Sequence, residues 1–137
     1  MTQFLLVASV QPYSEFSDLI FTPVQEDSFL AEVASTLFPT PSKPIWSIAP
    51  SGAEIGEVAY EAREAVLTGT EIGNTTLGRF LQQAMSRHDA LALFYASDFA
   101  QLPRATTPKE LLELIDEQLR VEDGSNLELY ALWPADG

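Results

Sequence analysis

Two largely apolar runs, residues 3–10 and 90–97, stand out in the hydrophobic pattern of the chain. Short apolar runs bounded by polar residues or proline are typical of strands that are covered on both faces. We therefore expect these two strands to lie centrally in a sheet. Residues 127–133 alternate between apolar and polar positions and predict a final strand, while residues 45–49 predict a short or edge strand. Residues 16–24 fit a strand or a helical turn about equally well.

Four segments repeat apolar residues with the period of an α-helix: 26–38, 54–67, 75–88 and a segment that starts at Thr107. The last of these has the clearest local signal. Thr107 stands at the N-cap position, Pro108 at the first helical position and Glu110 at the third, which is the pattern of a capping box.

These elements predict an α/β or α+β fold, with a three- to five-stranded mixed sheet and four helices packed on it. The chain has 137 residues, which is enough to bury a core without metals or disulfides. We expect a single compact domain over residues 1–137. From residue 90 onward the order is strand, helix, strand, so a C-terminal β-α-β unit is expected, right-handed if its strands are parallel.

Charge narrows the range of partners. The chain has 20 acidic and 7 basic residues and a net charge of −13, so its field repels phosphate and anionic lipid and attracts basic proteins. The basic residues are scattered along the sequence, which argues against nucleic acid as a partner. No segment approaches the ~20 apolar residues of a membrane span, so no membrane association is expected. No basic residue precedes Lys43, which speaks against a signal peptide and favours a cytoplasmic location.

Catalytic and cofactor motifs give little support for an enzyme. The chain has no cysteine and one histidine, His88, so neither a zinc nor a copper site is expected. Asp89 follows His88 directly, but adjacent residues do not form a Ser–His–Asp triad, and His88 fits the end of a helix better. Residues 49–56 place serine and glycine before a helix without the lysine or glycine spacing of a nucleotide site, so no cofactor is expected.

A stripe of glutamates is the most specific surface feature. Glu54, Glu57, Glu61 and Glu64 fall within about 80° of arc beside the apolar side of their helix. A solvated helix face is the default interpretation. A docking surface for a basic protein is the alternative, with Tyr60 as a candidate aromatic anchor. The acids do not have the spacing of a calcium loop. A second acidic patch is expected on the helix after Thr107, formed by Glu110, Glu113, Asp116 and Glu117.

Three functional hypotheses follow. The favoured one is an acidic, non-enzymatic domain that inhibits or escorts a basic partner protein. In size, charge and lack of a catalytic motif the chain is similar in character to many bacterial immunity proteins, which block the nuclease domains of toxins. No family motif accompanies this similarity, so it assigns no residues. The second hypothesis is a small enzyme or ligand-binding domain with a pocket at the carboxyl ends of the strands, using Tyr95, Ser97, Asp98 or His88. The third is a structural or adaptor subunit whose acidity serves solubility.

Overall fold

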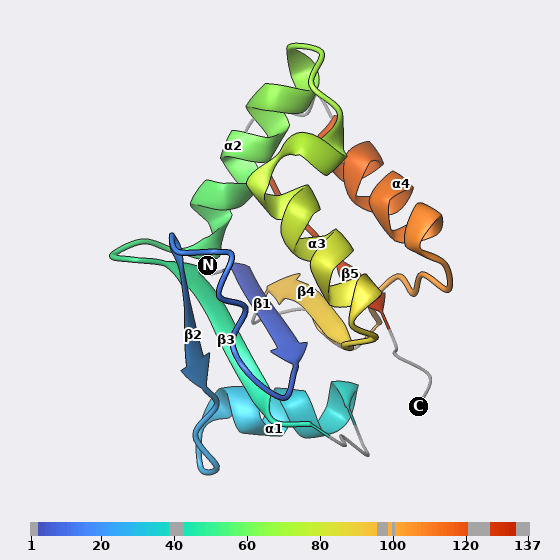
Figure 1. Cartoon of the computed structure of the whole chain (residues 1–137). Coiled ribbons are helices and arrows are strands. Elements are labelled where there is room, and N and C mark those ends of the chain that lie inside the picture. Colours follow the sequence, from blue (N-terminus) through green and yellow to red (C-terminus); the bar gives the residue numbers. More distant parts are fainter. Residues whose placement is uncertain (1–2, 39–42, 96–98, 100, 121–126, 134–137) are drawn as a thin grey trace.

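Five strands form one sheet in the computed structural model of the chain, which describes residues 3–38, 43–95, 99, 101–120 and 127–133. The strands are β1 (Gln3–Ala8), β2 (Leu19–Pro23), β3 (Ile45–Pro50), β4 (Leu91–Tyr95) and β5 (Ala131–Trp133). The helices are α1 (Phe29–Leu37), α2 (Ile55–Leu67), α3 (Thr76–Ser86) and α4 (Pro108–Leu119), with a 3-10 turn, η1 (Ile72–Asn74), before α3. The strands lie in the order β2-β3-β1-β4-β5 (Figure 1), which places β1 and β4 side by side in the interior of the sheet, as the apolar runs predict.

All four neighbouring strand pairs are antiparallel, so the α+β form of the predicted fold is confirmed. The sheet is antiparallel rather than mixed: among the described residues, parallel pairing is confined to an isolated bridge between Arg104 and Leu132. That bridge also explains why β5 runs antiparallel to β4. The segment around Arg104 runs parallel to β5 and therefore opposite to β4, so the chain has already reversed direction before α4 begins. The order β4, α4, β5 is as predicted, and the last strand enters antiparallel to β4.

The sheet carries helices on both faces. On one face the side chains of Leu5, Val7, Leu91 and Leu93 pack with α2, α3 and α4 in the larger core. On the other face Leu6, Ala92 and Phe94 pack with α1. Successive residues of a strand point to opposite faces, so continuous apolar runs are required where both faces are covered. Figure 1 shows α2, α3 and α4 gathered on the same side of the sheet.

Helix α4 begins as the capping box predicts. The Thr107 hydroxyl accepts a hydrogen bond from the backbone N–H of Glu110 at 3.1 Å. In a capping box the Glu110 carboxylate would accept from the backbone N–H of Thr107, the N-cap residue. Here it accepts instead from the backbone N–H and the hydroxyl of Thr106, one residue earlier, at 3.0 and 2.7 Å. These hydrogen bonds, that from the Thr106 backbone foremost, lower the pKa of Glu110 below its ordinary value.

Both edges of the sheet are protected against pairing with another strand. The outer edge of β5 is covered because Leu132 donates to the Pro103 carbonyl at 2.8 Å and accepts from Ala105 at 3.0 Å. On β2, proline at position 23 has no N–H to donate, and the N–H of Leu19 is already bonded to the Phe16 carbonyl at 3.1 Å. Few backbone N–H groups are therefore open to an added strand at either edge.

Candidate functional site

Helix α2 presents its glutamates to solvent because its opposite side is part of the core. It follows a turn in which Gly52 has φ +72°, a conformation that favours glycine. Its buried side chains are Ile55, Val58, Ala59, Ala62 and Val66. Glu54, Glu57, Glu61 and Glu64 are all exposed. With the half-exposed ring of Tyr60, these four form what we term the α2 acidic face. The structure thus brings together the five residues that the sequence predicts on this helix.

Three of the four carboxylates of the α2 acidic face have no counter-ion among the described residues. Within the described part of the chain, Glu57, Glu61 and Glu64 make no ion pair or side-chain hydrogen bond. Like charges three and four residues apart on a helix repel each other by a few tenths of a kcal/mol per pair. An exposed helix face tolerates this repulsion, and a cationic partner would relieve it.

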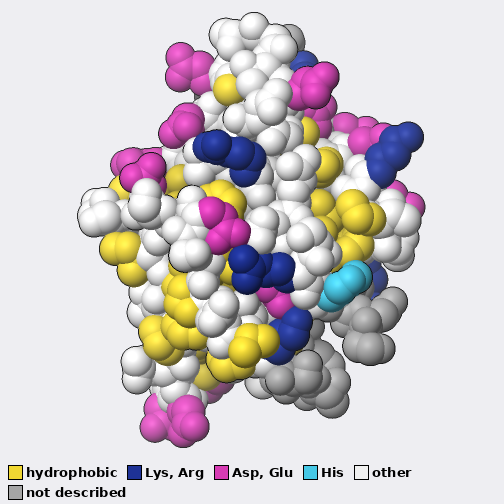
Figure 2. All heavy atoms as spheres, in the orientation of Figure 1, with side chains coloured by type: hydrophobic (Ala, Val, Ile, Leu, Met, Phe, Trp, Pro, Cys, Tyr) yellow, Lys and Arg dark blue, Asp and Glu magenta, His cyan; other side chains and the backbone are white. Residues whose placement is uncertain are grey.

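The second predicted patch, on α4, is largely neutralised by its own helix. Asp116 pairs with Arg120 at 2.9 Å, and Glu113 lies 3.8 Å from Lys109. Glu110 is engaged by Thr106, which leaves Glu117 as the patch residue without a side-chain partner in the described chain. Figure 2 shows acidic side chains over the outer flank of α2 and over α4, with basic side chains over α3 between them. The two predicted patches therefore do not form one continuous surface.

Tyr60 is held in place by the backbone of the C-terminal segment. Its hydroxyl accepts a hydrogen bond from the N–H of Leu127 at 3.3 Å, and the Tyr95 hydroxyl donates to the carbonyl of the same residue at 2.8 Å. The rings of Tyr95 and Tyr130 lie 6.0 Å apart, and the Tyr130 hydroxyl donates to Glu128 at 3.3 Å. The α2 acidic face is thus bordered by a group of tyrosines with fixed geometry.

Tyr95, one of the bordering tyrosines, is close enough to the acidic face for the charges there to change its pKa. Burial, followed by the charges of Glu128, Tyr60 and Glu54, raises the pKa of Tyr95 above its ordinary value. Sequence reasoning missed Glu128 and Tyr130 as members of this site. Their alternation within residues 127–133 indicates that they share a side of the segment, but only the fold places that segment against α2.

Of the residues named for the alternative pocket, Tyr95 and His88 lie in the described part of the chain. His88 follows α3 with φ +57°, is exposed, and donates its backbone N–H to the Met85 carbonyl at 3.1 Å, so it lies at a helix end as predicted. Ser97 and Asp98 lie outside the described residues. Among the residues that the structure describes, no three His, Asp or Glu side chains are arranged to hold a metal ion. No helix in the described ranges is long and apolar enough to cross a membrane.

Asp89 belongs to a buried polar cluster that sequence reasoning did not find. The Tyr13 hydroxyl donates to Asp89 Oδ2, and Lys43 Nζ lies 2.7 Å from Asp89 Oδ1. The Arg87 guanidinium stacks over the Tyr13 ring at 4.7 Å and pairs with Glu15 at 3.1 Å. The turn at His88 directs Asp89 inward, toward the loop before β2. Burial, then the hydrogen bond to Asp89, raises the pKa of Tyr13 strongly, so its phenol is a hydrogen-bond donor and not a base.

The raised pKa of Tyr13 predicts a loss of stability in alkaline solution. A tyrosine whose pKa is higher in the folded chain stabilises the fold fully below its ordinary pKa, and this contribution is lost as the pH rises toward the folded value. A Tyr13→Phe variant cannot ionise, so it should lose less stability than the wild type between about pH 9 and about pH 11. Urea denaturation at each pH measures the difference. Parallel profiles for the two proteins would contradict this prediction.

The fold and the surface define an antiparallel α+β domain with an exposed acidic helix bordered by tyrosines. No protein-family model, curated protein or solved structure matches the chain.

Proposed function

We propose that the chain is an acidic protein-binding domain that docks a basic partner protein through the α2 acidic face. The observation that supports this most directly is the combination of the exposed Glu57, Glu61 and Glu64, which have no ion pair in the described chain, with Tyr60, which is 49% exposed while its hydroxyl is held by Leu127. A fixed aromatic ring contributes contact area with little loss of conformational entropy on binding, and tyrosine is enriched at binding hot spots. The surrounding carboxylates supply long-range attraction and select for positive charge.

The distribution of charge favours α2 over the other acidic surface. A partner that approached α4 would compete with Lys109 and Arg120 for the same carboxylates. A partner that approached α3 would meet basic side chains (Figure 2). Glu57, Glu61 and Glu64 of α2 have no ion pair in the described chain and so have neither disadvantage. The net charge of −13 accelerates the encounter as a whole, while the α2 acidic face determines its orientation.

In its narrower form, the proposal is that the domain is a cytoplasmic bacterial protein of immunity type, which inhibits or escorts a toxin nuclease. A nuclease must present a basic surface to hold the phosphate backbone of its substrate. A row of carboxylates on a rigid helix can occupy such a surface in place of phosphates. The similarity in size and charge to immunity proteins supports this form, and the identity of the captured partner tests it.

Charge reversal on α2 is expected to abolish capture of the partner. A Glu57→Lys/Glu61→Lys variant should fail to recover, from extracts of the native host, a basic protein that the wild type recovers. With the purified partner, we expect the association rate constant to fall about tenfold or more, and the wild-type rate to fall with added salt. Pull-down followed by stopped-flow kinetics measures both effects.

The matched control is Glu113→Lys/Glu117→Lys on α4, which changes the net charge by the same amount. It should retain the partner, and thermal melts should show that both variants are folded. If both variants lose binding equally, total charge and not the α2 acidic face governs association. If both retain the partner, or if the wild type recovers no basic protein, the proposed function is wrong.

A further inference from the structure

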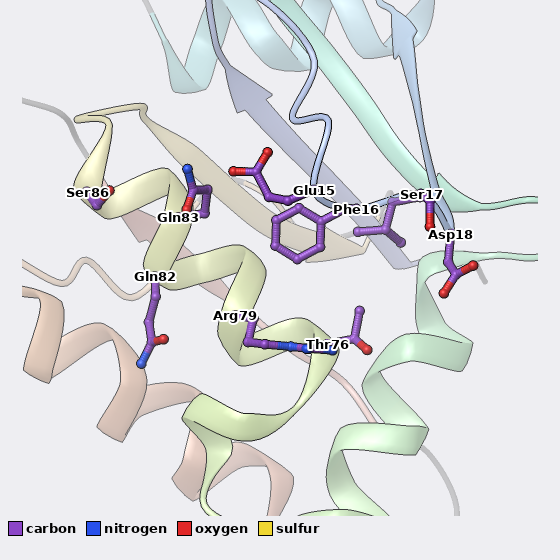
Figure 3. A pocket seen from close by; sticks show the side chains of 10 residues that line it. Glu15, Phe16, Ser17, Asp18, Thr76, Arg79, Gln82, Gln83 and Ser86 are labelled. Atoms are coloured by element: carbon purple, nitrogen blue, oxygen red, sulfur yellow. The ribbon is translucent and has the colours of Figure 1, made fainter.

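A cleft on the opposite side of α3 from the core has no role in the proposed docking. It lies between residues 15–19 and α3 and has a volume of about 480 Å³. That volume is within the range of pockets that bind small molecules. Figure 3 shows the Phe16 ring between Glu15 and Gln83 on one side and Arg79 and Thr76 on the other.

Several polar side chains of this cleft have no protein partner among the described residues and can bind a ligand. Within the described chain, the side chains of Arg79, Asp18, Thr76 and Gln83 make no hydrogen bond or ion pair. Glu15 is the exception, because it pairs with Arg87 at 3.1 Å. Arg79 and Asp18 are both exposed and line the same cleft without pairing to each other, so both charges are open to a ligand.

The charges on the two walls limit the kind of ligand. A simple anion would be repelled by Asp18, by Glu15 and by the net charge of −13. A simple cation would meet the Arg79 guanidinium. A molecule with no net charge and with separated ionic ends avoids both penalties, since each end finds the opposite charge on one wall. The unpaired hydroxyl of Thr76, on the same side of Phe16 as Arg79 (Figure 3), suits a ligand with a peptide group between its ends.

We propose that this cleft binds a short zwitterionic peptide of two or three residues, with its carboxylate on Arg79 and its ammonium group on Asp18. The guanidinium of arginine matches a carboxylate with two parallel hydrogen bonds, which gives the contact direction as well as strength. The Phe16 ring provides an apolar contact for a side chain of the peptide. This site is independent of the α2 acidic face, so failure of one proposal leaves the other intact.

The test uses three probes: alanyl-alanine, its N-acetyl derivative, which lacks the ammonium group, and its C-terminal amide, which lacks the carboxylate. Each is titrated into the isotope-labelled full chain while backbone amide resonances are followed by NMR. We expect saturable shifts within residues 15–19 and 76–86 for the free dipeptide. Each blocked derivative should bind about tenfold or more weakly, the loss expected for one charge-assisted hydrogen bond.

Two variants assign the ends of the ligand. Arg79→Gln should bind the free dipeptide and its amide equally, because the partner of the carboxylate is gone. Asp18→Asn should bind the free dipeptide and its N-acetyl derivative equally. Arg104→Gln, which removes an exposed arginine outside the cleft, should behave as the wild type. The proposal is overturned if the free dipeptide causes no saturable shifts in these segments, if the blocked derivatives bind as well as the free dipeptide, or if Arg79→Gln leaves the preference for a free carboxylate unchanged.

Discussion

Asp89→Ala is expected to lower the free energy of unfolding by about 3 kcal/mol. The carboxylate is 2% exposed and accepts from the Tyr13 hydroxyl and the Lys43 ammonium group. Its removal leaves a buried phenol without an acceptor and a cation without its counter-ion. The value lies at the lower end of the range for a broken buried pair because Lys43 is 26% exposed and can be hydrated in the variant.

The control for Asp89 is Asp116→Ala on α4. Its ion pair with Arg120 has a similar length, 2.9 Å against 2.7 Å, but Asp116 is 30% exposed where Asp89 is 2% exposed, and Arg120 is 50% exposed. An exposed pair of this kind contributes about 0–1 kcal/mol. Urea denaturation of both variants separates the effect of burial from that of contact distance. Equal losses in the two variants would contradict the view that the cluster around Asp89 fastens the loop before β2 to the end of α3.

The contrast between these two aspartates shows where sequence reasoning succeeds. Asp116 and Arg120 are four residues apart in a helix, so their spacing in the sequence alone places them together. Asp89 bonds to residues that precede it by 76 and 46 positions. Nothing in the local pattern specifies those partners. The left-handed turn at His88, which determines where Asp89 points, is a local helix end: His88 and Asp89 donate their backbone N–H groups to the carbonyls of Met85 and Ala84, at 3.1 and 2.9 Å, and histidine stands where glycine usually marks this turn in a sequence.

The same distinction applies to the strands and to the site. The apolar runs that predict β1 and β4 are confirmed because burial on both faces leaves a clear signature in sequence. The final strand is shorter than its alternating pattern predicts, because the N–H groups of Leu129 and Tyr130 bond to the side chains of Gln3 and Gln118 instead of a neighbouring strand. The acids of α2 follow from helical periodicity, whereas the tyrosines that border them come together only through such long-range contacts.

Gly78→Ala is expected to destabilise the fold by about 3 kcal/mol or more. A β-carbon at this position would lie 1.8 Å from the backbone carbonyl oxygen of Ile72 and 3.1 Å from the α-carbon of Gly73. Backbone atoms of η1 cannot turn aside as a flexible side chain can, so η1 must move away from α3. Because the Thr75 hydroxyl caps α3 by accepting from the N–H of Gly78 at 3.0 Å, that movement also threatens the cap, which contributes about 1 kcal/mol.

Gly56→Ala in α2 is the matched control, since both glycines lie in the first turn of a helix. There the nearest heavy atom to a new β-carbon is Gln3 Cβ at 4.0 Å, an ordinary contact. Alanine loses less conformational entropy than glycine when a helix forms. This variant should therefore be as stable as the wild type or up to about 1 kcal/mol more stable. Opposite signs for the two substitutions, measured by urea denaturation, would show that close approach of η1 and not helix propensity requires glycine at position 78. If Gly78→Ala were tolerated as well as Gly56→Ala, η1 would not pack against α3 this closely, and the positions of Thr76 and Arg79 in the peptide cleft would have to be reconsidered.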